Sequence, residues 1–433
     1  MPGGLLRHRQ PDVRRLGDAV LRRHRLCPAP ARFPDGALGA GHRAGRSAGQ
    51  EPGARAGVGR GRRHRFLHPS NLHRAVAVGG GDPAVARAWD REPYSVAGGA
   101  LGADVNLLQL GNGAFGETHL RAWRALGEAP WVFDPDPAAR ARAEAAGCRA
   151  LEDWRPALAA AEAVTVLGPS DTHFALAQEV LTAGKPVFIE KPATATAAEA
   201  ETLHRLAGGA VAMVGMYFRF HPRAIEAKRR IAAGTIGRIW ALSGRFAGFK
   251  RARRDAGVLR NDAIHFLDLM RWLVGGMPSS VHAVLRDHSG RGLEDFALLT
   301  LTWENGPAAQ LEVGLVQPGR WPDAVVPGAI TDKRLTVTGS EGALEIDFAA
   351  EAMTAWRARH HLADAKPPEL AREPVGAWPA DPVAVVAAEL AHFRDCVRAR
   401  RAPESGLMDA GVDIMRLIEA AERSSALGQA VRP

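Results

Sequence analysis

The chain has 433 residues, 46% of them hydrophobic and 24% charged, with a formal net charge of +9, so it can build more than one buried core. Its three cysteines, Cys27, Cys148 and Cys396, form no CxxC pair, which argues against a disulfide scaffold or zinc site and fits a reducing, cytoplasmic compartment. Every apolar run is too short to span a bilayer and the first residues lack a secretory signal, so we expect no membrane segment.

The positive charge lies in the first 104 residues. They hold 18 arginines, no lysine and eight acidic residues, a net charge of +10, which leaves −1 for the remainder. This leader, rich in Arg, Gly, Ala, Pro and His without a sustained period, is predicted to be disordered. A nucleic-acid-binding arm and an organelle transit peptide are two interpretations. We favour a third, an upstream extension translated from GC-rich DNA ahead of a start near Val105.

The next stretch predicts a strand, a glycine turn, a helix and a second strand. Residues 107–110 form an apolar run, residues 118–126 have helical spacing, and residues 131–133 form a second apolar run that ends at Asp134. This is the order that a dinucleotide-binding Rossmann domain requires. Asp134 would accept a hydrogen bond from a ribose 2′-hydroxyl and repel a 2′-phosphate, which favours NAD over NADP.

The glycines of the turn have separate predicted tasks. Gly111 permits the tight turn, Gly113 lets the backbone approach a pyrophosphate, and Gly116 lets the helix pack on the strand. The N–H groups at the start of the helix would hold the phosphates. The predicted cofactor residues here are Gly111, Asn112, Gly113, Ala114, Phe115 and Gly116.

Strands and helices continue to alternate up to about residue 221. The predicted elements are a helix over 138–146 closed by Gly147, a strand over 164–167, a helix with Ser170 or Asp171 as N-cap, a strand over 187–189, a helix over 197–206 and a strand over 211–214. Such repeated units imply a parallel sheet with helices on both faces. We therefore expect an α/β domain over residues 105–221.

The pattern changes after residue 221. A helix over 223–233 is followed by alternating runs at 239–248, 281–285, 296–303, 308–315, 334–338 and 343–348, and by helices at 383–398 and 408–427. Asn305-Gly306 is a hairpin signal between two of the runs. Residues 222–433 are thus predicted to form an α+β second domain with a mostly antiparallel sheet.

Several motifs together resemble the Gfo/Idh/MocA oxidoreductases, the family of glucose–fructose oxidoreductase and inositol dehydrogenase. They are the glycine turn, PSDTH at 169–173, AGKPVFIEKP at 183–192, IGRI at 236–239, GVLRNDAIHFLDLMRWLVG at 257–275 and KRLTVTGSEGALEID at 333–347. The resemblance covers about residues 105–433. It implies hydride transfer between NAD and a sugar or cyclitol, and a homodimer or homotetramer formed through the open face of the second sheet.

Lys191 is the first candidate catalytic residue. Oxidation of a secondary alcohol needs a group that takes the hydroxyl proton, and Lys191 follows a strand at the ligand-binding edge of the sheet. Burial beside a positive nicotinamide would lower the pKa of its amine. Glu190 could hold Lys191 in place, and the opposing interpretation is an ordinary loop lysine.

His265 is the second candidate. Asn261, Asp262 and Asp268 lie four and three residues before it and three after it, on neighbouring parts of one helical face. In the family the matching histidine is an acid/base or substrate ligand, and the position of Asn261 carries an aspartate. Asn261 cannot relay a proton and is predicted to cap the helix. Either Asp262 supplies the missing charge or His265 acts without a carboxylate; a core or capping histidine is the other interpretation.

The remaining assignments are to cofactor and substrate contacts. The resemblance places Pro169, Ser170, His173, Glu190, Lys191 and Pro192 beside the cofactor. Tyr217 and Arg219 are predicted to contact substrate, as is His265. The basic run over 250–254 either binds a substrate carboxylate or phosphate or is a solvated loop. His360-His361 has no acid at metal spacing, so we predict no metal.

The sequence thus predicts an NAD-dependent oxidoreductase acting on a ring hydroxyl or keto group of a sugar, sugar derivative or cyclitol. One alternative is an oxidoreductase that retains its cofactor and moves hydride between two substrates. Another is a catalytically silent NAD-binding regulator, motivated by Asn261. A nucleic-acid partner, suggested by the leader alone, is less favoured.

Overall fold

A computed structural model describes residues 106–350, 352–361, 366–378, 381–406 and 408–433. The predicted leader, residues 1–104, lies outside the described residues. Within the described part, no helix combines the length and apolar character that crossing a membrane requires.

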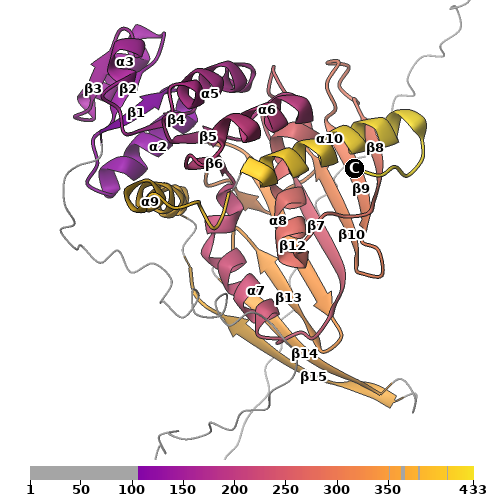
Figure 1. The fold of residues 1–433 in the computed structure, drawn as a ribbon. Helices are drawn as coiled ribbons and strands as arrows, with labels where there is room; N and C mark the ends of the chain where they lie inside the picture. The colour runs from indigo at the N-terminus through magenta and orange to yellow at the C-terminus, as the bar shows by residue number, and fades with distance from the viewer. Residues whose placement is uncertain (1–105, 351, 362–365, 379–380, 407) are drawn as a thin grey trace, which may run out of the picture. The chain divides into compact units, whose positions relative to one another are not determined.

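The first half is built on a parallel six-stranded sheet with strand order β3-β2-β1-β4-β5-β6 (Figure 1). The strands are β1 (Leu107–Leu110), β2 (Trp131–Phe133), β3 (Arg149–Leu151), β4 (Ala163–Val166), β5 (Val187–Glu190) and β6 (Ala212–Gly215). The helices between them are α2 (Ala114–Ala125), α3 (Pro137–Ala145), α4 (Arg155–Leu158), η1 (Ser170–Thr172), α5 (His173–Thr182) and α6 (Ala197–Ala207).

Local sequence explains these elements. Strands β1, β4, β5 and β6 are buried at every position, which is why their sequences are short and mostly apolar instead of alternating. Helix α6 begins with a capping box in which Thr196 and Glu199 each satisfy the other's backbone N–H. The strand order is that of a doubly wound Rossmann sheet, so the predicted fold class is confirmed.

The second half contains a nine-stranded sheet with the order β15-β14-β13-β12-β7-β10-β9-β8, and β11 pairs with β12. The strands are β7 (Ile239–Phe249), β8 (Ser280–Arg286), β9 (Phe296–Thr302), β10 (Ala308–Gly314), β11 (Trp321–Pro322), β12 (Ile330–Gly339), β13 (Gly342–Asp347), β14 (Met353–His361) and β15 (Lys366–Val375). The pairing is antiparallel except between β7 and β10. The predicted hairpin at Asn305 joins β9 to β10, and Asn305 has φ 52°.

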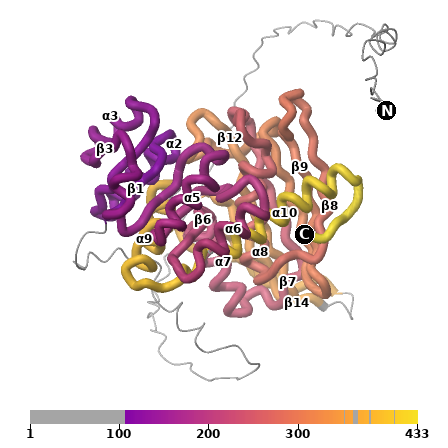
Figure 2. The backbone as a smooth tube through the Cα atoms, turned by 45° about the horizontal axis from the view of Figure 1, so that its top comes forward, coloured from indigo at the N-terminus to yellow at the C-terminus, as the bar shows by residue number. Residues whose placement is uncertain are grey.

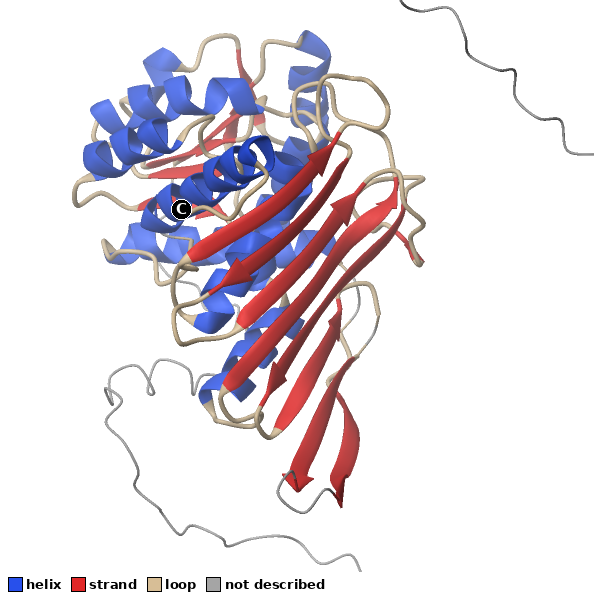
Figure 3. Ribbon diagram, turned by 90° about the vertical axis from the view of Figure 1, so that its right-hand side faces the viewer, coloured by secondary structure: helices blue, strands red, loops and turns tan. Residues whose placement is uncertain are grey.

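Helices cover one face of this second sheet, and Figure 3 shows the other face without helices over it among the described residues. The remaining helical segments are η2 (Tyr217–Phe220), α7 (Pro222–Ala232), η3 (Leu259–Ala263), α8 (Ile264–Val274), α9 (Pro382–Ala399) and α10 (Met408–Leu427). Helix α10 packs against both α6 and β8, and α9 packs against α2 (Figure 1 and Figure 2). The C-terminal helices therefore contact the elements of both sheets.

Candidate active site

The glycine turn has the geometry of a phosphate cradle. Gly111 has φ 104°, and a Cβ there would lie 2.7 Å from the backbone nitrogen of Gly168. A Cβ on Gly116 would lie 2.7 Å from the carbonyl oxygen of Gly111, so only glycine lets α2 pack on the turn. At Gly113 a Cβ would meet no atom within 4 Å, and no side chain caps the first N–H groups of α2, at Ala114 and Phe115. Open space beside uncapped N–H groups fits a pyrophosphate.

Asp134 lies where β2 ends, beside this cradle. Its Oδ2 accepts from the backbone N–H of Asn112 at 2.7 Å, and its Oδ1 accepts from that of Asp136 at 2.9 Å. A carboxylate oxygen accepts more than one hydrogen bond, so both oxygens keep capacity for ribose hydroxyls. The Asn112 side chain is buried and donates to the carbonyl of Ala139, which gives it a structural task.

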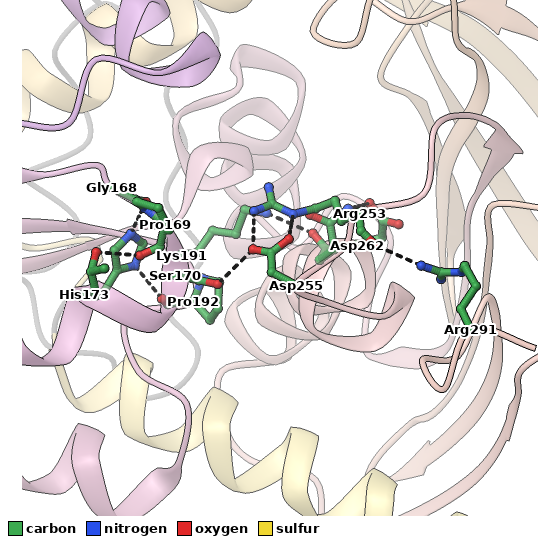
Figure 4. Close-up of polar contacts among 12 residues, drawn as sticks. Gly168, Pro169, Ser170, His173, Lys191, Pro192, Arg253, Asp255, Asp262 and Arg291 are labelled. Carbon is green, nitrogen blue, oxygen red and sulfur yellow. Dashed lines mark hydrogen bonds and ion pairs between the residues drawn. The ribbon is translucent and has the colours of Figure 1, made fainter. Parts of the chain in front are cut away.

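The segment after β4 joins the two halves of the chain. The two ring nitrogens of His173 lie 2.8 Å from the carbonyl oxygens of Pro192 and Gly168, so His173 ties the turns after β4 and β5 together (Figure 4). Ser170 Oγ donates to Asp255 Oδ2 at 3.3 Å across to the second half. Arg253 pairs with Asp255 and lowers the pKa of its carboxyl to about 2. The prediction that Ser170 or Asp171 caps the following helix is wrong, because α5 begins at His173 without a side-chain cap.

Glu190 and Lys191 lie at the end of β5. The buried Glu190 accepts the backbone N–H of Lys191 on Oε2 at 2.8 Å, and its Oε1 lies 3.3 Å from His119 Nε2. Lys191 Nζ donates to the carbonyl oxygen of Asn261 at 2.9 Å. Burial lowers the pKa of the Lys191 amine, while the charges of Glu190 and Asp262 oppose that shift. The amine is thus half-buried, oriented and easier to deprotonate than an ordinary lysine.

Asn261 and Asp262 lie near Lys191, but in a local structure that was not expected. Asn261 and Asp262 lie in the π-helical turn η3, a feature frequent at functional sites, so the prediction that Asn261 caps the helix is wrong. Asn261 offers its backbone carbonyl to Lys191 and its amide to Asp262 Oδ1 at 2.9 Å. Asp262, also 2.6 Å from Lys250 Nζ, favours the charged form of Lys191.

His265 is one helical turn after Asn261. Its ring stacks on Phe246, with centroids 6.0 Å apart, and meets Phe218 edge-on at 5.2 Å. Burial, followed by the charges of Lys191, Lys333 and Lys250, holds its pKa well below the usual value of 6.5. The imidazole is therefore neutral near pH 7 and can accept a proton or hydrogen bond.

Tyr217 and Arg219 have contacts that differ from those predicted. Arg219 makes a buried two-bond ion pair with Asp268, with Nε to Oδ2 at 2.7 Å, and its guanidinium lies over Trp272. Tyr217 packs edge-on against Phe218, and burial raises the pKa of its phenol. Both side chains thus have contacts within the protein, and their predicted contact with substrate stays a prediction.

Several ionisable residues near the site were not among the residues predicted from the sequence. Lys333 Nζ lies 2.6 Å from Asp323 and 5.0 Å from the centroid of the Phe246 ring, on which His265 stacks. His119 and Glu389 lie behind Glu190, buried in the layer between α2 and α9. Lys333 is the first residue of the motif at 333–347, but its place beside His265 depends on the pairing of β12 with β7. His119 and Glu389 lie outside the motifs, so only the packing of distant elements reveals them. Among the described residues, no group of three or more His, Cys, Asp or Glu side chains could hold a metal ion.

Comparison with known protein families gives matches in both halves of the chain. A model of the oxidoreductase family with an NAD-binding Rossmann fold matches residues 105–218, and a model of the GFO/IDH/MocA C-terminal domain matches residues 224–345. The chain belongs to the Gfo/Idh/MocA family, and the predicted NAD-dependent oxidoreductase class is confirmed.

Individual relatives are named dehydrogenases. The chain is 32% identical to inositol 2-dehydrogenase 2 of Saccharopolyspora erythraea over 48% of this chain and 66% of that one, about two thirds of its length. It is 34% identical to UDP-N-acetylglucosamine 3-dehydrogenase of Acidithiobacillus ferrooxidans over 49% of this chain and 68% of that one. A solved levoglucosan dehydrogenase in complex with NADH shares the fold, with a TM-score of 0.66 and 20% identity over 76% of this chain and 99% of that one.

Proposed function

We propose that the chain transfers a hydride between NAD and a ring hydroxyl or keto group of a sugar, sugar derivative or cyclitol. The observation that carries the proposal is the meeting of the Lys191 amine with the π turn before His265, at the edge of the sheet that carries the glycine cradle. The named activities of the relatives support the substrate class.

The residues of the chain divide the work. When bound, NAD supplies the acceptor or donor of the hydride. The glycine cradle and Asp134 would hold it, and Pro169 and Pro192 would lie beside it. Lys191 takes the proton of the substrate hydroxyl when the alcohol is oxidised and returns a proton to the oxygen when the ketone is reduced. The neutral His265 accepts a hydrogen bond from the same hydroxyl or a neighbouring one.

Lys191→Ala tests this assignment. Oxidation followed by NADH absorbance, against a sugar and cyclitol panel, should fall by about 10²–10⁴-fold in kcat, while the NADH Kd measured by fluorescence stays the same. Lys191→Arg is the matched control that keeps the charge and cannot deprotonate. An unchanged kcat in Lys191→Ala would refute the role; loss of NADH binding would make Lys191 a cofactor residue. A silent regulator predicts no turnover with any panel member, even in the wild type.

The proposed role of Lys191 predicts opposite pH dependences for oxidation and reduction. Because only the neutral amine accepts a proton, kcat/KM for oxidation should fall as pH drops through the pKa of Lys191, which burial places below 10.5. Reduction needs the ammonium and should lose rate as pH rises through the same value. Lys191→Arg should lack both limbs.

We also propose a cytoplasmic homodimer or homotetramer, as the family resemblance implies. The uncovered face of the second sheet supports the oligomer (Figure 3). The free thiols of Cys148 and Cys396 in the described residues support the reducing compartment. Sedimentation velocity of the purified chain distinguishes these assemblies from a monomer.

A further inference from the structure

Lys333 of β12 and Lys250, the residue after β7, contact the same aromatic ring as His265. Lys250 Nζ lies 4.9 Å and Lys333 Nζ 5.0 Å from the centroid of the Phe246 ring, on which His265 stacks. Strands β7 and β12 pair so that Phe246 lies opposite Lys333. Two ammonium groups and one neutral imidazole therefore surround the same buried ring.

Each lysine keeps donor capacity after its ion pair is formed. Lys250 pairs with Asp262 at 2.6 Å, and their side chains are 7% and 5% exposed. Lys333 pairs with Asp323 at 2.6 Å, with 15% and 1% exposed. An ammonium group has three donors, so each has N–H groups left beyond its single carboxylate.

The carboxylates of Asp323 and Asp262 differ in the number of other hydrogen bonds that they accept. Asp323 also accepts from Thr331 Oγ1 at 2.8 Å and from the backbone N–H groups of Val325 and Val326, so its charge is shared with groups other than Lys333. Asp262 Oδ2 is buried and has no partner among the described residues, which leaves one acceptor for a substrate hydroxyl.

The charges beside the reacting groups are of both signs. Those that act on His265 belong to Lys191, Lys333 and Lys250, and all three lower its pKa. On Lys191 the charges of Glu190 and Asp262 favour the ammonium, and those of Arg253 and Lys250 oppose it. Lys250 and Lys333 already have one carboxylate each, so a further anion is bound by their remaining N–H groups. A carboxylate or phosphate accepts stronger, charge-assisted hydrogen bonds from these groups than a neutral hydroxyl does.

We propose that the substrate carries an anionic group, a carboxylate or a phosphate, which Lys250 and Lys333 bind while Lys191 and His265 face the hydroxyl that reacts. This inference rests on the proposed function and narrows its substrate class. Lys250 and Lys333 are then specificity-determining residues.

Matched substrates test it on the full chain. D-glucose is compared with D-glucuronate and with D-glucose 6-phosphate, and myo-inositol with its monophosphate, in kcat/KM with NAD and in Kd by calorimetry with the NADH-bound enzyme. At least one anionic member should exceed its neutral counterpart about tenfold or more in kcat/KM and in affinity, since hydrogen bonds to charged groups differ by that amount. The uronate and phosphate arms distinguish the two sources of charge.

Lys333→Gln keeps a hydrogen-bond donor for Asp323 and removes the charge. It should reduce the anionic-to-neutral ratio about tenfold, mainly through KM, and Lys333→Arg should restore the ratio. Lys228→Gln is the matched control, because Lys228 is a half-buried lysine that donates to the carbonyl of Trp272, away from the site. Thermal unfolding of each variant checks that it folds.

The possible outcomes test the anionic subsite and the proposed oxidoreductase activity separately. The anionic subsite would be overturned if the anionic-to-neutral ratio of kcat/KM were equal in the wild type and Lys333→Gln, or if neutral substrates were preferred. Either result would leave the proposed oxidoreductase activity unaffected. Calorimetric binding of an anionic member that weakens in Lys333→Gln, without turnover of any panel member, would support the subsite and count against the proposed function. Neither binding nor turnover of any anionic member would overturn the subsite.

Discussion

Glu389 of α9 is a carboxyl that the fold buries without an ordinary hydrogen bond. Its side chain is fully buried, and neither oxygen has a partner of good geometry among the described residues, although the Met216 backbone weakly favours the ionised form. Burial, then the charges of Glu190 and Asp268, raises its pKa well above 4.5. Burial therefore favours the protonated form of Glu389, which adds no second negative charge behind Glu190.

Glu389→Gln tests this charge state through stability. Between pH 4.5 and its raised folded-state pKa, the folded protein holds a proton that the unfolded chain releases, so stability falls as pH rises. Glutamine does not titrate, so the unfolding free energy of the variant should gain on the wild type by about 1.4 kcal/mol per pH unit over this window. Denaturant unfolding from about pH 5 to 8 measures it. Glu152→Gln, at an exposed position, is the control, and a difference independent of pH would show that Glu389 is ionised in the folded state.

The residues of the site were predictable from sequence to different degrees. Lys191 and His265 could be selected as candidates because each lies in one of the quoted motifs. In the structure, Lys191 donates to Asn261 of η3, and His265 follows η3 by two residues. Lys333 could not, because its place beside His265 depends on the register that sets it opposite Phe246 on β7. Asn261 was misjudged as a cap because a π turn has no clear sequence pattern distinct from the start of an α-helix.

At the scale of elements, the β1–α2 turn separates two tasks of glycine. A Cβ added to Gly113, which has φ −68°, would meet no atom within 4 Å, whereas a Cβ added to Gly116 would lie 2.7 Å from the carbonyl oxygen of Gly111. Gly113→Ala should leave the melting temperature close to that of the wild type and weaken NADH binding tenfold or more, because the methyl group occupies the space of the pyrophosphate. Gly116→Ala should lower both, because α2 must shift. Thermal unfolding and NADH fluorescence titration measure the two effects.

Each of the two variants, Gly113→Ala and Gly116→Ala, has a result that would contradict the prediction. Full NADH affinity in Gly113→Ala would place the phosphates elsewhere, and unchanged stability in Gly116→Ala would mean that α2 relaxes without cost. The outcome bears on the whole cofactor assignment, since Asp134 is held by Asn112 from the same turn.

Strands with a buried face were predictable, and strands without one were not. Strand β9 alternates between buried and more exposed positions, which gives the sequence a period of two. Strand β15 is exposed at nine of its ten positions and contains three prolines, so neither periodicity nor composition indicates it. It forms because β14 offers it a partner along the edge of the sheet, and that pairing is absent from any local pattern. Helices α9 and α10 were foreseen as helices, but their packing on α2 and α6 was not.

At the scale of the described molecule, the two sheets share one core. A single continuous cluster of buried side chains includes Leu108 and Ile189 of the first sheet, Leu242 and Leu335 of the second, and Leu417 of α10. Polar contacts cross between the halves as well, among them the bond from Arg260 to the carbonyl of Ala195 and the bond from Ser170 to Asp255. Neither half can expose its apolar surface without exposing that of the other.

We therefore expect residues 106–433 to unfold as one cooperative unit, although the first sheet alone carries the glycine cradle. In differential scanning calorimetry of the full chain, this part should give a single main transition. NADH at about 100 times its Kd should stabilise that whole transition by roughly 2.7 kcal/mol, because a ligand that binds only the folded state stabilises every element that unfolds with its site. Intrinsic fluorescence and far-ultraviolet circular dichroism should give coincident midpoints with and without NADH. If the halves were independent, NADH would instead shift one of two transitions and leave the other in place, and the positions of Lys191 and His265 would then depend on a docking equilibrium between domains rather than on a shared core.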